Sequence, residues 1–175
     1  MRWDDVSDQK CSVARSLALL GDRWTMLLIR EAFLGTRRFD ELQALTGASP
    51  QVVASRLARL VEGGIMRKVP YQQRPTRYEY RLTEMGRELQ PVLFTLMTWG
   101  DKWLDDGQGP PNPLRHTECG AITRPQLTCN ECGEPVLAGN VMNEPSERWA
   151  RQRREMLAGV HADHAEPAMD DRVAS

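Results

Sequence analysis

The sequence lacks any long hydrophobic run. Although 41% of its 175 residues are hydrophobic, no apolar stretch approaches the roughly 18 residues that a membrane-spanning helix needs. Its first ten residues, MRWDDVSDQK, are polar and acidic and lack the apolar segment of a secretory signal peptide. We therefore expect a cytoplasmic protein with no membrane partner and with reduced thiols. The length suits one domain with an appendage, or two small domains.

The sequence also has almost no net charge. The formal charge is −1 and the sequence pI is about 6.3, which by themselves do not indicate a nucleic-acid-binding protein. The charge is unevenly distributed, however. Residues 49–82 contain seven Lys and Arg but only two Glu, so this segment carries +5 and the rest of the chain −6. A local positive patch of this kind is what a phosphate backbone attracts.

Residues 49–60 (SPQVVASRLARL) predict a short helix with two unlike faces. Ser49 can cap its first turn, and Pro50 suits the first helical position, where its missing N–H needs no partner. The outer face is small, polar and cationic, and it has the group types that hydrogen-bond to base edges in the DNA major groove. The alternative is an ordinary surface helix with solvated arginines. The apolar stripe consists of Val53, Leu57 and Leu60, and the candidate DNA-binding face of Gln51, Val52, Ser55, Arg56 and Arg59.

Two further helices are predicted near the start of the chain, at residues 11–20 and 23–34. Gly21 ends the first of them, and Asp22 can cap the second. The second helix is apolar over much of its surface, so we expect it to be central to the core.

The segment that follows has the pattern of a helix-turn-helix. Residues 39–45 predict a short helix, and the Gly-containing turn 46–48 joins it to the two-faced helix at 49–60. A short helix, a tight turn and an amphipathic second helix are typical of this motif. Arg37 and Arg38 lie in the turn before the first of these helices and are candidates for contacts to DNA phosphates.

A β-hairpin is predicted directly after the two-faced helix. Its strands are residues 65–69 and 77–82, and a polar loop, 72–76, connects them. A hairpin in this position is a wing, whose loop can lie along the DNA backbone or enter the minor groove. There an arginine such as Arg74 is favoured by the negative potential, and we assign Arg77 to the same wing. The alternative is a hairpin that only provides a soluble edge.

A long helix is predicted from residue 84 to about residue 104, with Thr83 as its cap. Pro91 lies inside it and should kink it or remove a backbone hydrogen bond. An apolar, tryptophan-containing stripe on this helix has little left to pack against within one chain, so we expect it to pair with a second subunit. The alternative is packing onto the first two helices, and both arrangements can hold along the length of this helix. The stripe consists of Leu93, Leu96, Trp99 and Trp103.

These motifs together resemble a known family. The ordered series CxVA, GDRWT, RRFDEL, SPQVVASRL and RYEYRLTEMG, over about residues 8–105, is similar to HxlR proteins, which are dimeric winged-helix transcription regulators related to MarR proteins. The resemblance implies a homodimer that presents two recognition helices to a pseudo-palindromic DNA operator and responds to a small-molecule or redox signal. The alternative is a winged-helix protein-interaction module without sequence-specific DNA binding.

A second pattern follows a Pro- and Gly-rich linker at residues 106–115. The sequence HTECG and, ten residues beyond its cysteine, CNECG each place two metal-ligand side chains three positions apart and then a glycine. Two such knuckles predict a tetrahedral, structural zinc site in a zinc-ribbon-like module at 116–142. Four protein ligands leave no open position, and no base pairs with a nucleophile, so we expect no enzyme activity. The alternatives are reduced surface thiols or a CxxC disulfide. The predicted ligands are His116, Cys119, Cys129 and Cys132.

The resemblance also implies a sensing role for one cysteine, because several HxlR-type proteins are thought to detect oxidants or electrophiles at this place. The matching residue is Cys11, which begins the first predicted helix, a position where a thiol is more available to oxidants and electrophiles. The alternative is an inert, half-buried side chain. A small organic effector in an apolar cavity near the dimer helices is the other class of signal, and the sequence does not identify it.

The predicted fold is therefore mainly α with a small β-hairpin wing, a winged helix-turn-helix, plus a small zinc-ribbon-like C-terminal module. The predicted winged-helix and dimerisation domain is 10–105, preceded by an arm at 1–9. After the metal module come a candidate helix at 143–159 and a polar, acidic tail at 160–175, which we expect to be disordered.

Overall fold

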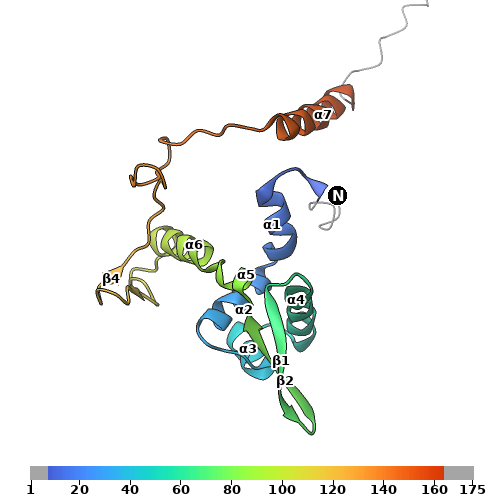
Figure 1. Cartoon of the computed structure of the whole chain (residues 1–175), viewed down its shortest axis with the longest axis vertical. Helices are drawn as coiled ribbons and strands as arrows, with labels where there is room; N and C mark the ends of the chain where they lie inside the picture. Colours follow the sequence, from blue (N-terminus) through green and yellow to red (C-terminus); the bar gives the residue numbers. More distant parts are fainter. Residues whose placement is uncertain (1–7, 164–175) are drawn as a thin grey trace, which may run out of the picture. The chain divides into compact units, whose positions relative to one another are not determined.

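The computed structural model describes residues 8–163 (Figure 1). These residues divide into two compact units: one is Leu19–Val141, and the other joins the flanking segments 8–18 and 142–163. The larger unit contains both the predicted winged-helix region and the predicted metal module, which the sequence-based boundaries separate. Helix α1 (Ser12–Leu20) crosses the boundary between the units. In the part of the chain that is described, no helix is long and apolar enough to cross a membrane.

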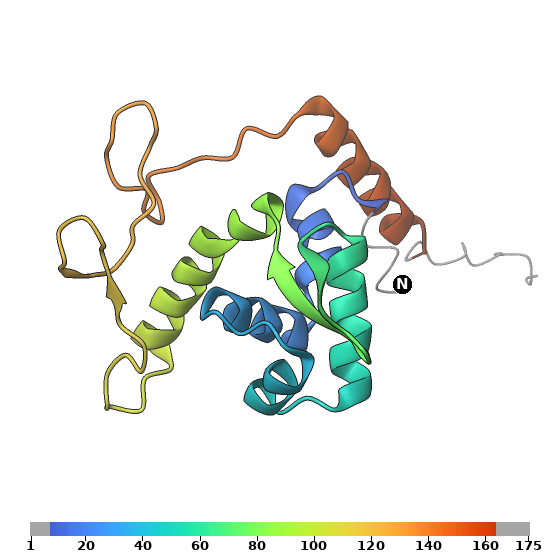
Figure 2. The same ribbon diagram turned by 60° about the horizontal axis from the view of Figure 1, so that its bottom comes forward.

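Three helices form the framework of the larger unit: α2 (Arg23–Phe33), α3 (Phe39–Thr46) and α4 (Pro50–Glu62). They pack on one another (Figure 2). The predicted caps of α2 and α4 are confirmed, since the Asp22 carboxylate accepts from the N–H groups of Trp24 and Thr25 and the Ser49 hydroxyl accepts from Val52. Gly47 ends α3 with a φ of 70°, a left-handed conformation that glycine adopts without steric cost.

The core of this unit confirms the predicted amphipathic stripe of α4, whose three apolar side chains are fully buried. They pack with side chains from α2, α3 and the segment after α4. Burying one such aliphatic side chain contributes about 1.5–3 kcal/mol, so this cluster fixes how α4 is presented. Its fully buried members are Leu28, Ile29, Leu42, Val53, Leu57, Leu60, Ile65 and Met66.

The predicted hairpin is present and is longer than expected. Strand β1 (Met66–Gln73) pairs antiparallel with β2 (Thr76–Leu82), and Gln73 opposes Thr76. The predicted loop at 72–76 is therefore mostly strand, with Arg74 and Pro75 alone at the turn. The hairpin extends beyond α3 and α4 (Figure 1).

The long helix predicted at residues 84–104 is wrong as a single helix. The structure has a short helix α5 (Glu84–Arg87), capped by Thr83 as predicted, and a separate helix α6 (Gln90–Trp103). Pro91 lies in the first turn of α6 instead of inside a continuous helix, where its missing N–H has no intrahelical partner to lose. The proline thus marks a helix start and not a kink.

Two small antiparallel pairings follow α6. Strands β3 (Leu114–Arg115) and β4 (Ile122–Thr123) form the first, so the predicted linker 106–115 ends in a strand. An isolated bridge between Thr128 and Pro135 forms the second.

The last element is helix α7 (Glu147–Asp163). It confirms the helix predicted at 143–159 and extends it into the predicted tail, the rest of which lies outside the described residues. Most of the predicted arm at 1–9 also lies outside them.

Candidate nucleic-acid interface

The outer face of α4 is polar and has short side chains. Gln51, Ser55 and two alanines that the sequence analysis did not single out, Ala54 and Ala58, are exposed, whereas Val52 is half-buried. Alanine and serine let a helix backbone approach a surface closely. The face is held in one orientation because the opposite stripe of the same helix is fully buried.

Arg56 was predicted to face solvent or DNA, but its guanidinium binds the carboxylate of Asp22. Its Nη2 donates to Asp22 Oδ2 at 3.0 Å, and its Nε lies 2.9 Å from Asp22 Oδ1. The guanidinium lowers the pKa of the Asp22 carboxyl below its usual value, assisted by the N–H groups of Trp24 and Thr25. Asp22 therefore both caps α2 and ties that cap to α4, a role that helical periodicity could not reveal because the partners are 34 positions apart.

Arg59 belongs to the last turn of α4 and is half-buried. On the wing, Arg74 and Arg77 are both exposed, with Arg74 at the hairpin turn. The predicted cations of the helix and of the wing thus belong to one compact unit.

The wing and the start of α3 together enclose a cationic depression of about 410 Å³. It brings together Arg38 and Arg77, two of the predicted phosphate-binding residues, and adds Lys68, which the sequence analysis did not assign; Asp40 is the one carboxylate in its described lining. Two tyrosines position these cations: the Arg38 guanidinium lies 5.1 Å from the Tyr71 ring centre, and the Lys68 ammonium lies 4.2 Å from that of Tyr78. Exposed cation–π contacts contribute about 0.5–1 kcal/mol each, so they restrict the side chains without neutralising them.

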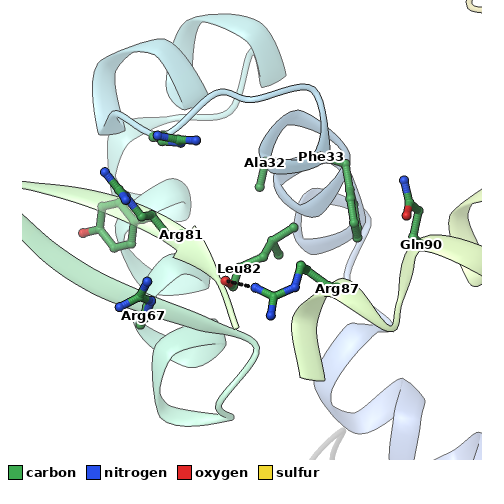
Figure 3. Close-up of a pocket in the computed structure, with 9 residues that line it drawn as sticks. Ala32, Phe33, Arg67, Arg81, Leu82, Arg87 and Gln90 are labelled. Atoms are coloured by element: carbon green, nitrogen blue, oxygen red, sulfur yellow. Dashed lines mark hydrogen bonds between the residues drawn. The ribbon is translucent and has the colours of Figure 1, made fainter. Parts of the chain in front are cut away.

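Arg37 belongs to a different cavity, although it is adjacent to Arg38 in the sequence. This arginine pocket of about 440 Å³ (Figure 3) lies between the hairpin, α2 and the start of α6. Arg81 is partly neutralised, since its Nη2 lies 2.8 Å from the Glu79 carboxylate, and Arg87 donates to the Leu82 carbonyl. The described lining contains four arginines and no carboxylate: Ala32, Phe33, Arg37, Arg67, Tyr80, Arg81, Leu82, Arg87 and Gln90.

The hairpin also pairs with the segment before α3. The Tyr80 N–H donates to the Arg37 carbonyl at 2.8 Å, and Arg38 forms a bridge with Glu79. These backbone contacts hold Arg37 and Arg38 on opposite sides of one extended segment, which explains why they line different cavities.

Helices, turn and hairpin in this order, with the cations described above, are the arrangement of a winged helix-turn-helix. A comparison with protein families matches residues 19–108 to the HxlR-like helix-turn-helix family, over half of the chain. The chain belongs to this family. It is a transcriptional regulator of the helix-turn-helix type, which implies DNA as its partner.

Individual relatives extend the match. The uncharacterized HTH-type transcriptional regulator Rv3095 of Mycobacterium tuberculosis is 49% identical over 134 residues, covering 77% of this chain and 85% of the relative. The crystal structure of PA1607, a candidate transcription factor, matches with a TM-score of 0.72 and 34% identity over 81% of this chain and 99% of that one. Both matches are longer than the family segment, so this HxlR protein and these two share sequence or structure beyond it.

A third relative bears on regulation. The redox regulator HypR in its reduced form matches with a TM-score of 0.51 and 29% identity, over 54% of this chain and 95% of HypR. The matching relatives named here are regulators and not enzymes.

The stripe predicted at the dimer interface is divided by the structure. Leu93 is only 7% exposed and packs in the core of the single chain, which accords with the alternative of packing within the chain. Leu96, Trp99 and Trp103 remain more than half exposed. Cys11 is half-buried and directly precedes α1, on which Val13 is exposed.

The predicted metal ligands form two separate pairs. His116 Nδ1 lies 3.3 Å from Cys119 Sγ. The N–H groups of Cys132 and Glu131, with the Cys132 thiol, lower the pKa of Cys129. Among residues 8–163, no group of three or more candidate ligands comes together. The structure thus brings the members of each pair together and leaves the two pairs apart.

Proposed function

We propose that the protein acts as a homodimer that reads a pseudo-palindromic DNA operator, with α4 in the major groove and the wing against the adjacent backbone. The observation that carries the proposal is the exposed, short-side-chain face of α4, held rigid by its buried stripe and flanked by cations of the same unit. Such a face lets hydrogen-bonding groups reach base edges.

The individual roles follow from the positions of the side chains on α4 and on the wing. We assign Gln51, Ser55 and Arg59 to base contacts and Val52 to the flank of the same face. Arg56 is a positioning residue in this proposal, because its guanidinium already binds Asp22. Contacts to phosphates are assigned to the wing and the segment before α3, with Arg37, Arg38, Arg74 and Arg77.

Exposed apolar side chains on α6 support the proposal of a second subunit. Leu96, Trp99 and Trp103 are 53%, 54% and 63% exposed in one chain. Large apolar side chains concentrated on one short helix are typical of a contact surface, and the same helix of a second copy would cover them by two-fold symmetry.

The test is a fluorescence-anisotropy titration of the full chain against its own upstream intergenic DNA, with random DNA as the competitor and salt varied. Arg59→Ala should weaken specific binding by about 1–3 kcal/mol if this side chain makes a bidentate base contact. Arg74→Glu should weaken binding to every sequence and flatten the salt dependence. Arg124→Glu, which makes the same charge change at an exposed site outside the proposed interface, is the matched control and should behave as wild type.

Two results would contradict this proposal, one on DNA binding and one on the dimer. Binding that is salt-insensitive and no tighter than to random DNA would favour the alternative winged-helix protein-interaction module. A monomeric mass in solution, unchanged by Trp99→Ala, would contradict the proposed dimer.

For the signal, we propose an anionic effector with an apolar body in the arginine pocket (Figure 3). Four arginines line this pocket, of which only Arg81 pairs with a carboxylate among the described residues, so the pocket attracts an anion. Phe33 and Leu82 offer an apolar wall. Calorimetric titration with a panel of aromatic carboxylates tests this idea. Binding should be lost in Arg67→Ala, whereas binding that survives this change would place the effector elsewhere.

The redox alternative rests on Cys11 and on the similarity to HypR, which is named a redox regulator. Oxidant should then release DNA from the wild-type protein and not from Cys11→Ser. Equal release from both proteins would assign the response to the other thiols, and no release from either would exclude redox control at Cys11.

A further inference from the structure

Two short hairpins, which the proposed regulator function does not use, follow α6. In the first, β3 pairs with β4, so that Leu114 opposes Thr123. In the second, Thr128 bridges Pro135, and the Val136 N–H donates to the Leu127 carbonyl at 2.8 Å. The second hairpin repeats the first 13 positions later.

The turns of the hairpins share one hydrogen-bond pattern. The His116 N–H donates to the Ala121 carbonyl at 2.9 Å, and the Cys129 N–H donates to the Glu134 carbonyl at 2.8 Å. Each turn is closed further by its glycine, because the N–H of Gly120 donates to His116 O and that of Gly133 to Cys129 O, both at 2.8 Å.

These turns require glycine and bring the ligand pairs together. The φ angles of Gly120 and Gly133 are 71° and 76°, in the left-handed region that side chains with a Cβ rarely adopt. In the first turn, the imidazole and thiol are 3.3 Å apart. The second turn holds Cys129 and Cys132 three positions apart with the same pattern of backbone hydrogen bonds. Two ligand side chains three positions apart, in a tight turn closed by a glycine, are the arrangement of a metal knuckle.

Nothing apolar holds the two hairpins together. From residue 104 to residue 141 no side chain is buried. Ile122, Leu127 and Leu137 are 58%, 57% and 62% exposed. Segments of this size without a core are stabilised by disulfides or by a metal ion, and all the cysteines here are free.

We propose that the two hairpins close on a single zinc ion ligated by His116, Cys119, Cys129 and Cys132. The ligand set, one imidazole and three thiolates, is that of a structural zinc site, with no position left for water or substrate. Only residues 124–126 separate β4 from the second hairpin, so the hairpins stay within a short reach of one another. Binding releases the protons of the three thiols and converts two preformed pairs into one tetrahedral site.

The experiment uses the full chain, reduced and stripped of metal with a chelator, and then titrated with Co²⁺ and with Zn²⁺ against a chromophoric competitor. We expect one metal ion per chain, a tetrahedral cobalt spectrum and thiolate-to-cobalt charge transfer. Cys119→Ser and Cys132→Ser should each lower the affinity by more than about 100-fold, beyond the usual effect of an outer-shell change. Cys11→Ser is the matched control and should leave the affinity and the spectrum unchanged.

His116→Ala distinguishes a four-ligand site from a site made by the second knuckle alone. If the metal were held by Cys129 and Cys132 only, His116→Ala and Cys119→Ser would bind like wild type, and the proposal would be overturned. Failure to bind stoichiometric metal, or a Cys129–Cys132 disulfide in the protein as purified without oxidant, would overturn it too. Far-UV circular dichroism of each variant shows that the helical region is folded. Operator binding is measured separately, so the metal site and the regulator function can fail independently.

Discussion

The winged-helix region and the paired hairpins are ordered by different means, although they belong to the same compact unit. Residues 19–103 enclose a cluster of fully buried aliphatic side chains. The hairpins at 114–136 bury none, and their defined features are backbone hydrogen bonds and left-handed glycines. One region is thus held by apolar packing, and the other has only local turns.

The difference shows what local backbone structure can and cannot do. A tight turn fixes the direction of the side chains that it carries, which is why each ligand pair is already assembled. It supplies no contact between one turn and the next, and these hairpins lack the apolar area for such a contact. A metal ion provides that contact in our proposal, while α4 obtains its fixed orientation from the core.

We expect the largest effect when one leucine is truncated in each of the two regions, the winged-helix region and the hairpins. Leu57→Ala removes a fully buried side chain and should lower the free energy of unfolding by about 2–5 kcal/mol. Leu127→Ala removes one that is 57% exposed, and we expect a change within about 0.5 kcal/mol. Urea denaturation followed by circular dichroism at 222 nm measures both.

The comparison of the two leucines can also fail. A cost for Leu127→Ala similar to that for Leu57→Ala would mean that the hairpins have an apolar core in solution, for example against a second subunit. The view that they lack packing would then be wrong.

A smaller effect is expected from glycines, which the two regions need for different reasons. A Cβ at Gly86 would lie 2.1 Å from the Ile65 carbonyl oxygen, a backbone atom that cannot move away. Gly86→Ala should therefore destabilise the winged-helix region by about 1–3 kcal/mol. The matched control is Gly100→Ala in α6, where nothing lies within 4 Å of the new Cβ and helix propensity favours alanine by about 1 kcal/mol.

In the hairpins the same substitution should act through the backbone alone. Gly120 has open space around it and a φ of 71°, so Gly120→Ala costs about 1–2 kcal/mol of left-handed strain. If the proposed metal site is right, Gly120→Ala lowers the affinity for zinc. The urea unfolding transition of the helices stays unchanged. Unaltered zinc affinity would show that the turn does not depend on its glycine.

Most of the framework could be predicted from the sequence, because its signals are local. The spacing of Val53, Leu57 and Leu60 identified the buried stripe of α4, and Asp22, Ser49 and Thr83 identified three helix caps. Each signal uses neighbours within a few positions, where helix geometry alone decides which side chains share a face.

What the sequence analysis missed depends on long-range geometry or on competition between two local rules. The pairing of Arg56 with Asp22 requires α2 and α4 to be placed first. At Pro91, the predicted continuous helix competed with a helix start at the proline, and the start is what the structure has. We expected Leu93 at a subunit interface, but it packs in the core of the single chain. The sequence does not show that the core has room for this side chain.

The smallest effect we predict concerns the same long-range pair, and it separates capping from charge. Asp22→Asn keeps a capping oxygen for Trp24 and Thr25 but removes the charge beside Arg56, so the stability at pH 7 should fall by about 0.2–1 kcal/mol, as for a partly exposed ion pair. Because the Asp22 pKa is lowered in the folded protein, its charge stabilises the fold above the unfolded value of about 3.9. This contribution is lost as the pH falls through the lowered pKa. The urea midpoints of wild type and Asp22→Asn should therefore differ by a constant amount near neutrality, and this difference should shrink as the pH falls below about 4. A difference that does not depend on pH would mean that the carboxylate acts only as a cap.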